Sequence, residues 1–139
     1  MAKETGLGWT SYSVDDAGGT LRDLRSASIN LAWTLPRGVQ DVTSLAVSAY
    51  ERLLLLADMS TTTNFVFDDA TNSVHDVFKT VTSSSVAREF LITVSGQSLG
   101  VTNTPTLLPT DYSMTRAQDG SFVGSVPMVL ANGAIPEWS

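Results

Sequence analysis

The sequence predicts a mainly β, antiparallel fold with one or two short α-helices at its flanks. Three observations lead to this prediction: short segments alternate between apolar and polar residues, turn-forming residues separate them, and only two stretches have helical spacing. The length of 139 residues fits a single domain with one core. We assign residues 10–131 to that core, residues 1–9 to an N-terminal arm and residues 132–139 to a C-terminal arm, because the two ends show no strand or helix period.

Three segments alternate as half-buried strands do. They are residues 28–35, 59–67 and 86–95. Residues 59–67 are rich in hydroxyl-bearing β-formers, which suits a sheet with one face in water. We expect Trp33 to belong to the core. The apolar sets expected on the buried faces are Ile29, Leu31, Trp33 and Leu35 in the first segment and Phe90, Ile92 and Val94 in the last.

Turn signals define further strands. Asp119-Gly120 separates residues 110–117 from residues 121–130 and predicts a long hairpin, since this pair tolerates the positive φ angles of a tight turn. Pro127 cannot donate to a ladder, so we expect it on an edge strand or at a bulge. A short strand over residues 10–14 precedes residues 15–20, which we expect to form an exposed loop.

Two segments open with a helix-capping pattern. Ser48-Ala49-Tyr50-Glu51 leads into residues 52–57 and predicts a first helix. Ser73-Val74-His75-Asp76 opens a shorter helix in which Val74, Val77, Phe78 and Val81 have helical spacing. Either helix is expected to cover a face or an edge of the sheet.

The composition excludes several classes of site. The chain has no cysteine and one histidine, which rules out disulfides, thiolate metal sites and clusters of imidazole ligands. A net charge of −6 argues against binding the phosphate backbone of nucleic acids. Only 16% of residues are charged, which indicates that partners cover much of the surface. Without a membrane span or a signal peptide, the protein is expected to be soluble and made in a cytoplasm.

No catalytic or cofactor-binding constellation is found. His75 has no serine on a Gly-x-Ser-x-Gly elbow to act on, so it is interpreted as a helix-surface residue. The pairs Asp15-Asp16 and Asp68-Asp69 are interpreted as solvated loop residues rather than an acid and base pair or a calcium site. Gly18-Gly19 lacks the flanking residues of a phosphate-binding loop. We therefore predict no enzyme activity, no cofactor and no metal.

The candidate functional residues are instead candidates for subunit contacts. Trp9 and Trp138 border the two arms, where a monomer has difficulty burying them, and an arm tryptophan can anchor on a neighbouring subunit. The alternative is that each ring folds back on its own domain. The remaining candidates come from the exposed loop and are Asp15, Asp16, Gly18 and Gly19.

Three stretches together resemble the tail tube (major tail) proteins of siphophages, particularly those of actinobacterial hosts. They are residues 8–14, residues 35–42 with the following segment 48–56, and residues 111–120. The resemblance lies in their order and spacing over nearly the whole chain. It implies a β-sandwich or half-barrel with a flanking helix, a structural protein of the virion tail made in the host cytoplasm, and assembly as stacked hexameric rings.

The resemblance also implies partners. The protein would contact itself within and between rings, together with the tape measure, tail terminator and distal tail proteins, and no membrane. Double-stranded DNA would pass through the lumen during ejection without specific binding. Acidity fits this role, because a lumen biased to negative charge keeps DNA off the wall.

Three other functions remain open from the sequence. A carbohydrate-binding or adhesive β-sandwich module could use Trp9 and Trp138 as aromatic platforms, and would stay small rather than polymerise. The second alternative is the inner tube of a contractile injection system, which has the same fold and also assembles as stacked rings. A small hydrolase built on His75 is the third.

Overall fold

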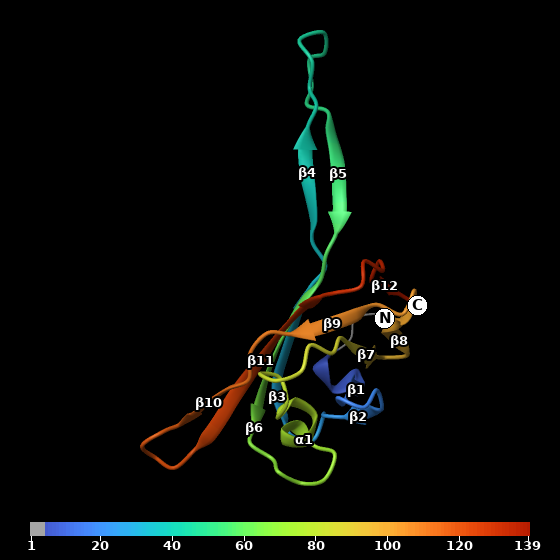
Figure 1. Ribbon diagram of the computed structural model, residues 1–139. Helices are drawn as coiled ribbons and strands as arrows, with labels where there is room; N and C mark the ends of the chain where they lie inside the picture. Colours follow the sequence, from blue (N-terminus) through green and yellow to red (C-terminus); the bar gives the residue numbers. More distant parts are fainter. Residues whose placement is uncertain (1–4) are drawn as a thin grey trace.

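The computed structural model describes residues 5–139 (Figure 1). The expected mainly β, antiparallel architecture is confirmed. The elements, in chain order, are a 3-10 turn Gly6–Gly8, β1 Trp9–Asp15, β2 Leu21–Asp23, β3 Ser28–Thr34, β4 Arg37–Asp41, β5 Arg52–Ala57, β6 Ser60–Val66, α1 Val74–Phe78, β7 Arg88–Val94, β8 Gln97–Thr102, β9 Thr106–Pro109, β10 Ser113–Arg116, β11 Phe122–Leu130 and β12 Glu137–Trp138.

The body consists of two sheet halves that share strand β7. On one side, β7 pairs with β1 and with β8. β1 in turn pairs with β2, and β8 pairs with β12. On the other side, the first residues of β7 pair with β9, which leads to β11, β6 and β3. All pairings are antiparallel. The halves therefore form one wrapped sheet, with α1 beside its lower end (Figure 1).

The core lies between the two halves. Its fully buried members include Tyr12 and Ile92 from one half and Phe65 and Met128 from the other. The Tyr12 hydroxyl is hydrogen-bonded to the Thr63 hydroxyl, so the two halves are joined by a polar contact as well as by apolar packing. Burial raises the pKa of Tyr12 to about 12, because a buried phenolate is poorly solvated.

A buried arginine joins three elements at one end of the core. Arg88, at the start of β7, is 1% exposed. Its Nη1 donates to the carbonyl oxygens of Asp15 at 2.9 Å and Val77 at 2.6 Å. The guanidinium lies over the ring of Phe78, 5.8 Å from the centroid. Arg88 thereby fixes β1 and α1 against β7.

The alternating segments form strands close to the expected bounds. Phe90 and Ile92 of β7 are buried, and in β6 Thr61, Thr63 and Phe65 are buried between more exposed neighbours. The expectation for residues 28–35 is wrong in part. Ile29 is exposed beside a register shift, and Leu35 lies beyond the strand.

Trp33 is half-buried rather than a member of the closed core. Its strand, β3, is the last strand of the sheet, so it has a neighbouring strand on one side only. The alternation is therefore confirmed for Leu31 and Trp33, while the depth of burial of Trp33 was overestimated.

The predicted C-terminal hairpin is confirmed as β10 and β11. Gly120 has a φ of +94°, and the Asp119 side chain accepts the Ser121 N–H. The expectation for Pro127 is wrong, because β11 is an interior strand and pairs with β6 without a register shift there. Pro127 is tolerated where β9 ends and β10 has not yet begun, and its carbonyl accepts the Thr110 N–H.

One of the two predicted helices is present. Helix α1 opens near Ser73 as expected, although the Ser73 hydroxyl donates to Asp68 instead of capping the helix. The helix predicted from Ser48 is wrong, since residues 52–57 form β5 and pair with β4. The Glu51 N–H, which the capping pattern assigned to Ser48, donates to the Thr43 hydroxyl at 2.9 Å. Cross-strand pairing thus replaces the local cap.

We predict that Arg88→Met lowers the free energy of unfolding by about 2–6 kcal/mol, because two buried carbonyl groups lose their donor at about 1–3 kcal/mol each. Chemical denaturation measures this. Arg116→Met is the matched control, since Arg116 is exposed in β10 and such substitutions change stability by roughly 0.5 kcal/mol or less. Equal midpoints for the two variants would contradict the role given to Arg88.

Candidate assembly surfaces

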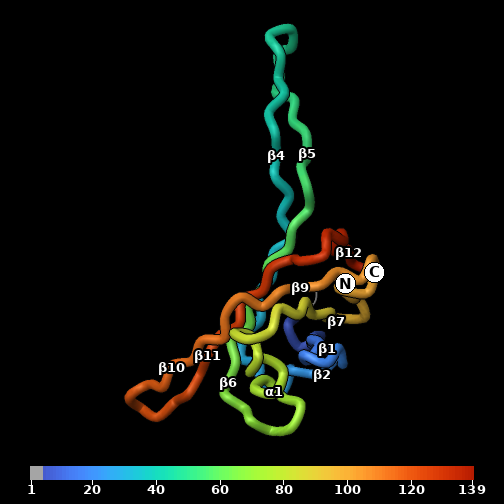
Figure 2. Tube along the Cα trace, in the orientation of Figure 1, coloured from blue at the N-terminus to red at the C-terminus, as the bar shows by residue number. Residues whose placement is uncertain are grey.

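The β4–β5 hairpin projects away from the body and contacts little else of the chain (Figure 1 and Figure 2). Its strands carry large exposed apolar side chains, among them Leu54, 60% exposed, and Leu56, 90% exposed. Further exposed apolar residues in the hairpin are Val39, Val42, Leu45, Val47, Tyr50, Leu53 and Leu55. An isolated two-stranded ribbon is marginally stable in water, so this hairpin is suited to being covered by another molecule.

Local hydrogen bonds nevertheless give the hairpin a defined shape. The Asp41 carboxylate accepts the Thr43 N–H and hydroxyl, and Thr43 in turn binds Glu51 across the base of the tip loop. Arg37 Nε donates to the Leu55 carbonyl at 2.9 Å. The leucines are therefore presented on an ordered ribbon rather than on a loose loop.

A large open groove lies where the hairpin joins the body. It has a volume of about 820 Å³. One wall is the end of β5, and the other is the segment before β12. Its lining is mainly apolar and consists of Arg37, Leu54, Leu55, Leu56, Ala57, Gly133, Ala134, Ile135 and Glu137.

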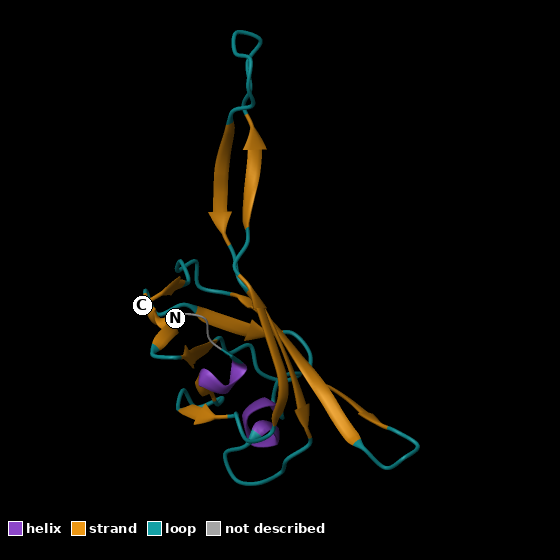
Figure 3. Cartoon of the chain, turned by 180° about the vertical axis from the view of Figure 1, so that it is seen from behind, coloured by secondary structure: helices purple, strands orange, loops and turns teal. Residues whose placement is uncertain are grey.

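Four strands of the described sheet have a neighbouring strand on one side only: the short strands β2 and β12, and the strands β3 and β10. β3 pairs only with β6, and β10 pairs only with β11, so within residues 5–139 no strand covers their outer sides. Figure 3 shows the sheet from behind, with β10 and β11 extending beyond the body. β3 contains no proline and no charged residue. Such an edge is open to pairing with another chain.

The tryptophans named as candidates lie on the body. Trp9 begins β1, where its Nε1 donates to the Ser11 carbonyl at 3.0 Å and its ring is 6.1 Å from that of Tyr12. Trp138 lies in β12, is 43% exposed, and has its ring 6.1 Å from that of Trp33. Trp9 and Trp33 line one open groove of about 450 Å³. Residues 1–4 of the expected N-terminal arm lie outside the described residues.

The structure separates the four loop candidates. Asp15 ends β1 and is buried, with its carboxylate accepting the Glu89 N–H at 3.3 Å. Asp16 caps the turn by accepting the N–H groups of Gly18 and Thr20, and it pairs with Arg22 at 3.0 Å. Gly18 and Gly19 are exposed, and Gly19 has a φ of +89°. The expected exposed loop therefore begins at Asp16, because the Asp15 side chain points into the body.

The remaining candidates for chemistry have structural contacts. His75 is half-buried, with Nδ1 3.1 Å from the Tyr112 hydroxyl and its ring 5.0 Å from that of Phe67. It is therefore less exposed than the surface position expected. Among the described residues, no three His, Asp or Glu side chains are grouped to hold a metal ion, and no helix is long and apolar enough to cross a membrane.

Comparison with known proteins gives structural matches only. A chain in the virion of a native gene transfer agent particle matches with a TM-score of 0.69 and 14% identity over 99% of both chains. A chain in the tail of an empty gene transfer agent particle with C6 symmetry matches with a TM-score of 0.68 and 15% identity, over 99% of this chain and 98% of that one. The fold is shared with these chains. No protein-family profile and no curated protein sequence matches.

Sequence reasoning missed the projecting hairpin. One signal against the predicted helix was available. In a helix, the run Leu53 to Leu56 would place apolar side chains all around the helix axis, whereas an amphipathic helix has them along one face. The free edges of β3 and β10 have no sequence signal, since the order of strands in a sheet depends on pairings distant along the chain.

Because Asp15 is buried, we predict that its charged form destabilises the fold at neutral pH. Burial raises its pKa, an effect that the hydrogen bond from the Glu89 N–H opposes. The folded protein therefore binds the Asp15 proton more tightly than the unfolded chain does, and stability falls as pH rises through this range. We expect Asp15→Asn to raise the unfolding midpoint at pH 7 and to leave it nearly unchanged near pH 3.

Asp16→Asn is the matched control with the opposite sign. The N–H of Thr20 lowers the pKa of Asp16, with Arg22 adding to the effect. Its charged form stabilises the fold above the ordinary pKa, and this contribution is lost as pH falls. Urea denaturation at both pH values tests the pair, and a loss of stability at pH 7 in both variants would contradict the account of Asp15.

Proposed function

We propose that this chain is a structural protein of a phage-like tail, which polymerises as stacked hexameric rings into the tail tube that conducts DNA. The observation that carries the proposal is the fold shared, end to end, with chains of a gene transfer agent particle and of its C6-symmetric tail. The surfaces of this chain support it independently.

The hairpin supports contacts between copies. Its exposed leucines need a cover that the body does not supply, and burying one leucine side chain contributes about 1.5–3 kcal/mol. A projecting ribbon can reach a neighbouring subunit in the next ring. The apolar groove at its base is of a kind that another copy's apolar side chains can fill.

The free edges support closure of a ring. β3 and β10 are the two outer strands of the part of the sheet ordered β3-β6-β11-β10, so β3 of one copy can pair with β10 of the next. Repetition of one such contact around a closed ring leaves neither of these two edges exposed, and stacking of rings gives an open-ended tube.

The proposed tube also implies a location, partners and an origin for the protein. The protein would be located in the virion tail after synthesis in a host cytoplasm. Its partners would be its own copies and the tape measure, tail terminator and distal tail proteins. A non-contractile siphophage tail of an actinobacterial host is the origin that the sequence resemblance favours, and no enzyme activity or cofactor is proposed.

Negative-stain microscopy of the purified protein, together with sedimentation over a range of concentrations, tests the proposal. Rings with sixfold symmetry or hollow tubes are the expected result. A monodisperse monomer at every concentration would overturn it and favour a binding module, which glycan binding would then test.

The first assembly prediction concerns the hairpin. Leu54→Asp with Leu56→Asp should raise the critical concentration for polymerisation at least ~10-fold, since losing even one buried leucine contact of about 1.5–3 kcal/mol corresponds to roughly 10- to 100-fold. Folding should be unaffected because both side chains are exposed in the monomer. Sedimentation measures assembly, and circular dichroism with chemical denaturation measures folding.

Leu21→Asp is the control for this variant, since Leu21 is an exposed leucine of β2 in the body. It should polymerise as the parent does. Equal assembly of all three proteins would show that the hairpin leucines are not contacts.

The second assembly prediction separates the two candidate tryptophans. Trp138→Ala should reduce polymerisation while lowering stability by only about 1 kcal/mol, because the residue is 43% exposed in the monomer and this exposed part is available to a neighbour. Trp9→Ala should lower stability by roughly 2–3 kcal/mol, since Trp9 packs against the core. The opposite ranking in denaturation experiments would contradict this assignment.

A further inference from the structure

The sheet formed by β3, β6, β11 and β10 has one covered face and one open face. Thr61, Thr63 and Phe65 of β6 and Val126 and Met128 of β11 point to the core. Side chains alternate along a strand, so the intervening positions form the open face. By strand register, these positions are Asn30, Ala32 and Thr34 of β3, Ser60, Thr62, Asn64 and Val66 of β6, Val123, Ser125, Pro127 and Val129 of β11, and Ser113 and Thr115 of β10.

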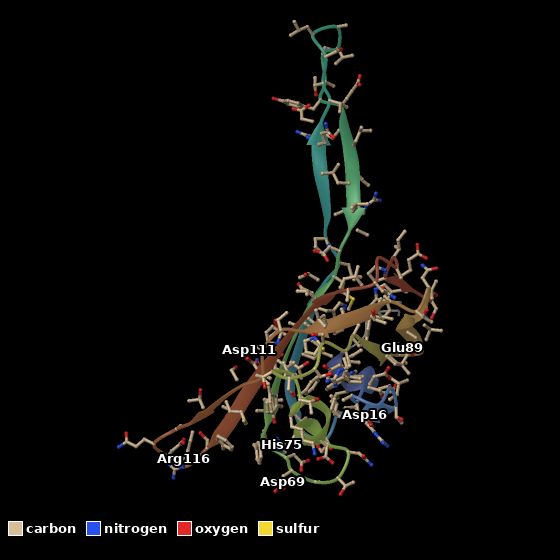
Figure 4. The ribbon with its side chains drawn as sticks, viewed as in Figure 1. Asp16, Asp69, His75, Glu89, Asp111 and Arg116 are labelled. Carbon is tan, nitrogen blue, oxygen red and sulfur yellow. The ribbon has the colours of Figure 1, made fainter. Side chains whose placement is uncertain are left out.

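None of these described positions carries a charge, although the chain has 8 basic and 14 acidic residues. Small hydroxyl and amide groups dominate instead. Neighbouring hydroxyls bond across strands, Thr34 to Ser60 at 3.0 Å and Ser113 to Ser125 at 3.2 Å. Of the charged residues labelled in Figure 4, Asp16, Asp69 and Glu89 lie on the body, while Asp111 and Arg116 lie before and at the end of β10, outside these positions.

One row of polar side chains crosses the whole sheet. Asn30 is paired with Asn64, Asn64 with Ser125, and Ser125 with Ser113. We call these four residues the polar row. It begins on one free edge of the sheet, at β3, and ends on the other, at β10. If β3 and β10 of adjacent copies pair in a ring, the row continues from subunit to subunit as a closed belt.

We propose that this open face lines the lumen of the tube as a charge-free wall of hydroxyl and amide groups along which double-stranded DNA passes. This inference rests on the proposed function. It replaces the expectation from the sequence that negative charge lines the lumen, since no carboxylate occupies a described strand position on the face that runs from edge to edge.

The chemistry of the face suits a passing polyanion. Lysine or arginine there would bind phosphates and hold the duplex in a salt-dependent manner. Hydroxyl and amide groups exchange hydrogen bonds with water and hold no phosphate strongly, so the duplex slides on a hydrated surface. The other surfaces fit this role less well, because the hairpin exposes leucines that favour protein contacts and the body carries the charges that keep a particle soluble.

The location of the face is tested by single thiols, since the chain has no cysteine. Assembled tubes of Thr62→Cys are treated with biotin-maleimide and then with streptavidin, a protein much wider than a DNA duplex. Thr20→Cys and Ser85→Cys, at exposed positions of the body, are the controls. We expect Thr62→Cys to incorporate biotin but to bind streptavidin only after the tubes are dissociated, whereas at least one control binds it on intact tubes.

Two results would overturn the inference: streptavidin bound along intact Thr62→Cys tubes, or no incorporation of biotin because the face is buried between copies. Absence of tubes in the parent protein would instead count against the proposed function, so the two failures are distinguishable.

The neutrality of the wall is tested by adding one positive charge per subunit. Asn64→Lys and the control Thr20→Lys are assembled in the presence of a short DNA duplex, and the DNA that sediments with the tubes is measured. We expect Asn64→Lys tubes to retain at least ~10-fold more DNA than parent or Thr20→Lys tubes at low salt, and to release it at high salt. Equal retention by both lysine variants would contradict a wall in contact with DNA.

Discussion

The body of this protein depends on the strand β7, which belongs to both halves of the sheet, and on the arginine that begins it. Arg88 is buried and donates to main-chain carbonyls of β1 and of α1. Burying a guanidinium is costly, and it is tolerated here because fixed acceptors and the Phe78 ring receive it. With β7 held in this way, the two halves close on a common core that includes the Tyr12 to Thr63 contact.

Three features of the chain lie outside this core and have no function in a single copy. The β4–β5 hairpin exposes leucines, β3 and β10 have free edges, and the open face of the sheet between those edges has no charge. In the proposed tube, the hairpin would make the contact between rings, the two edges would make the contact within a ring, and the open face would form the lining. The physical requirement common to all three is repetition, because one copy alone cannot cover its own edges.

Part of the fold could be predicted because some residues act locally. The alternation of Thr61, Thr63 and Phe65 with polar neighbours gives β6, and Asp119-Gly120 gives the β10–β11 turn. The helix expected from Ser48 was wrong since Glu51 finds its partner in Thr43, on the opposite strand of the hairpin. A capping pattern describes only one of the hydrogen bonds available to such an N–H, and in this structure the partner comes from across the hairpin.

What the sequence determined by itself is therefore the class of fold, the strand faces and the acidic, cysteine-free composition, all of which depend on residues close together along the chain. The tertiary structure decided which strands are at an edge, how deeply Trp33 and Asp15 are buried, and that Asn30, Asn64, Ser125 and Ser113 form one row. These features depend on register between strands that are distant in sequence. Register is fixed by packing of the whole core, which no local pattern encodes.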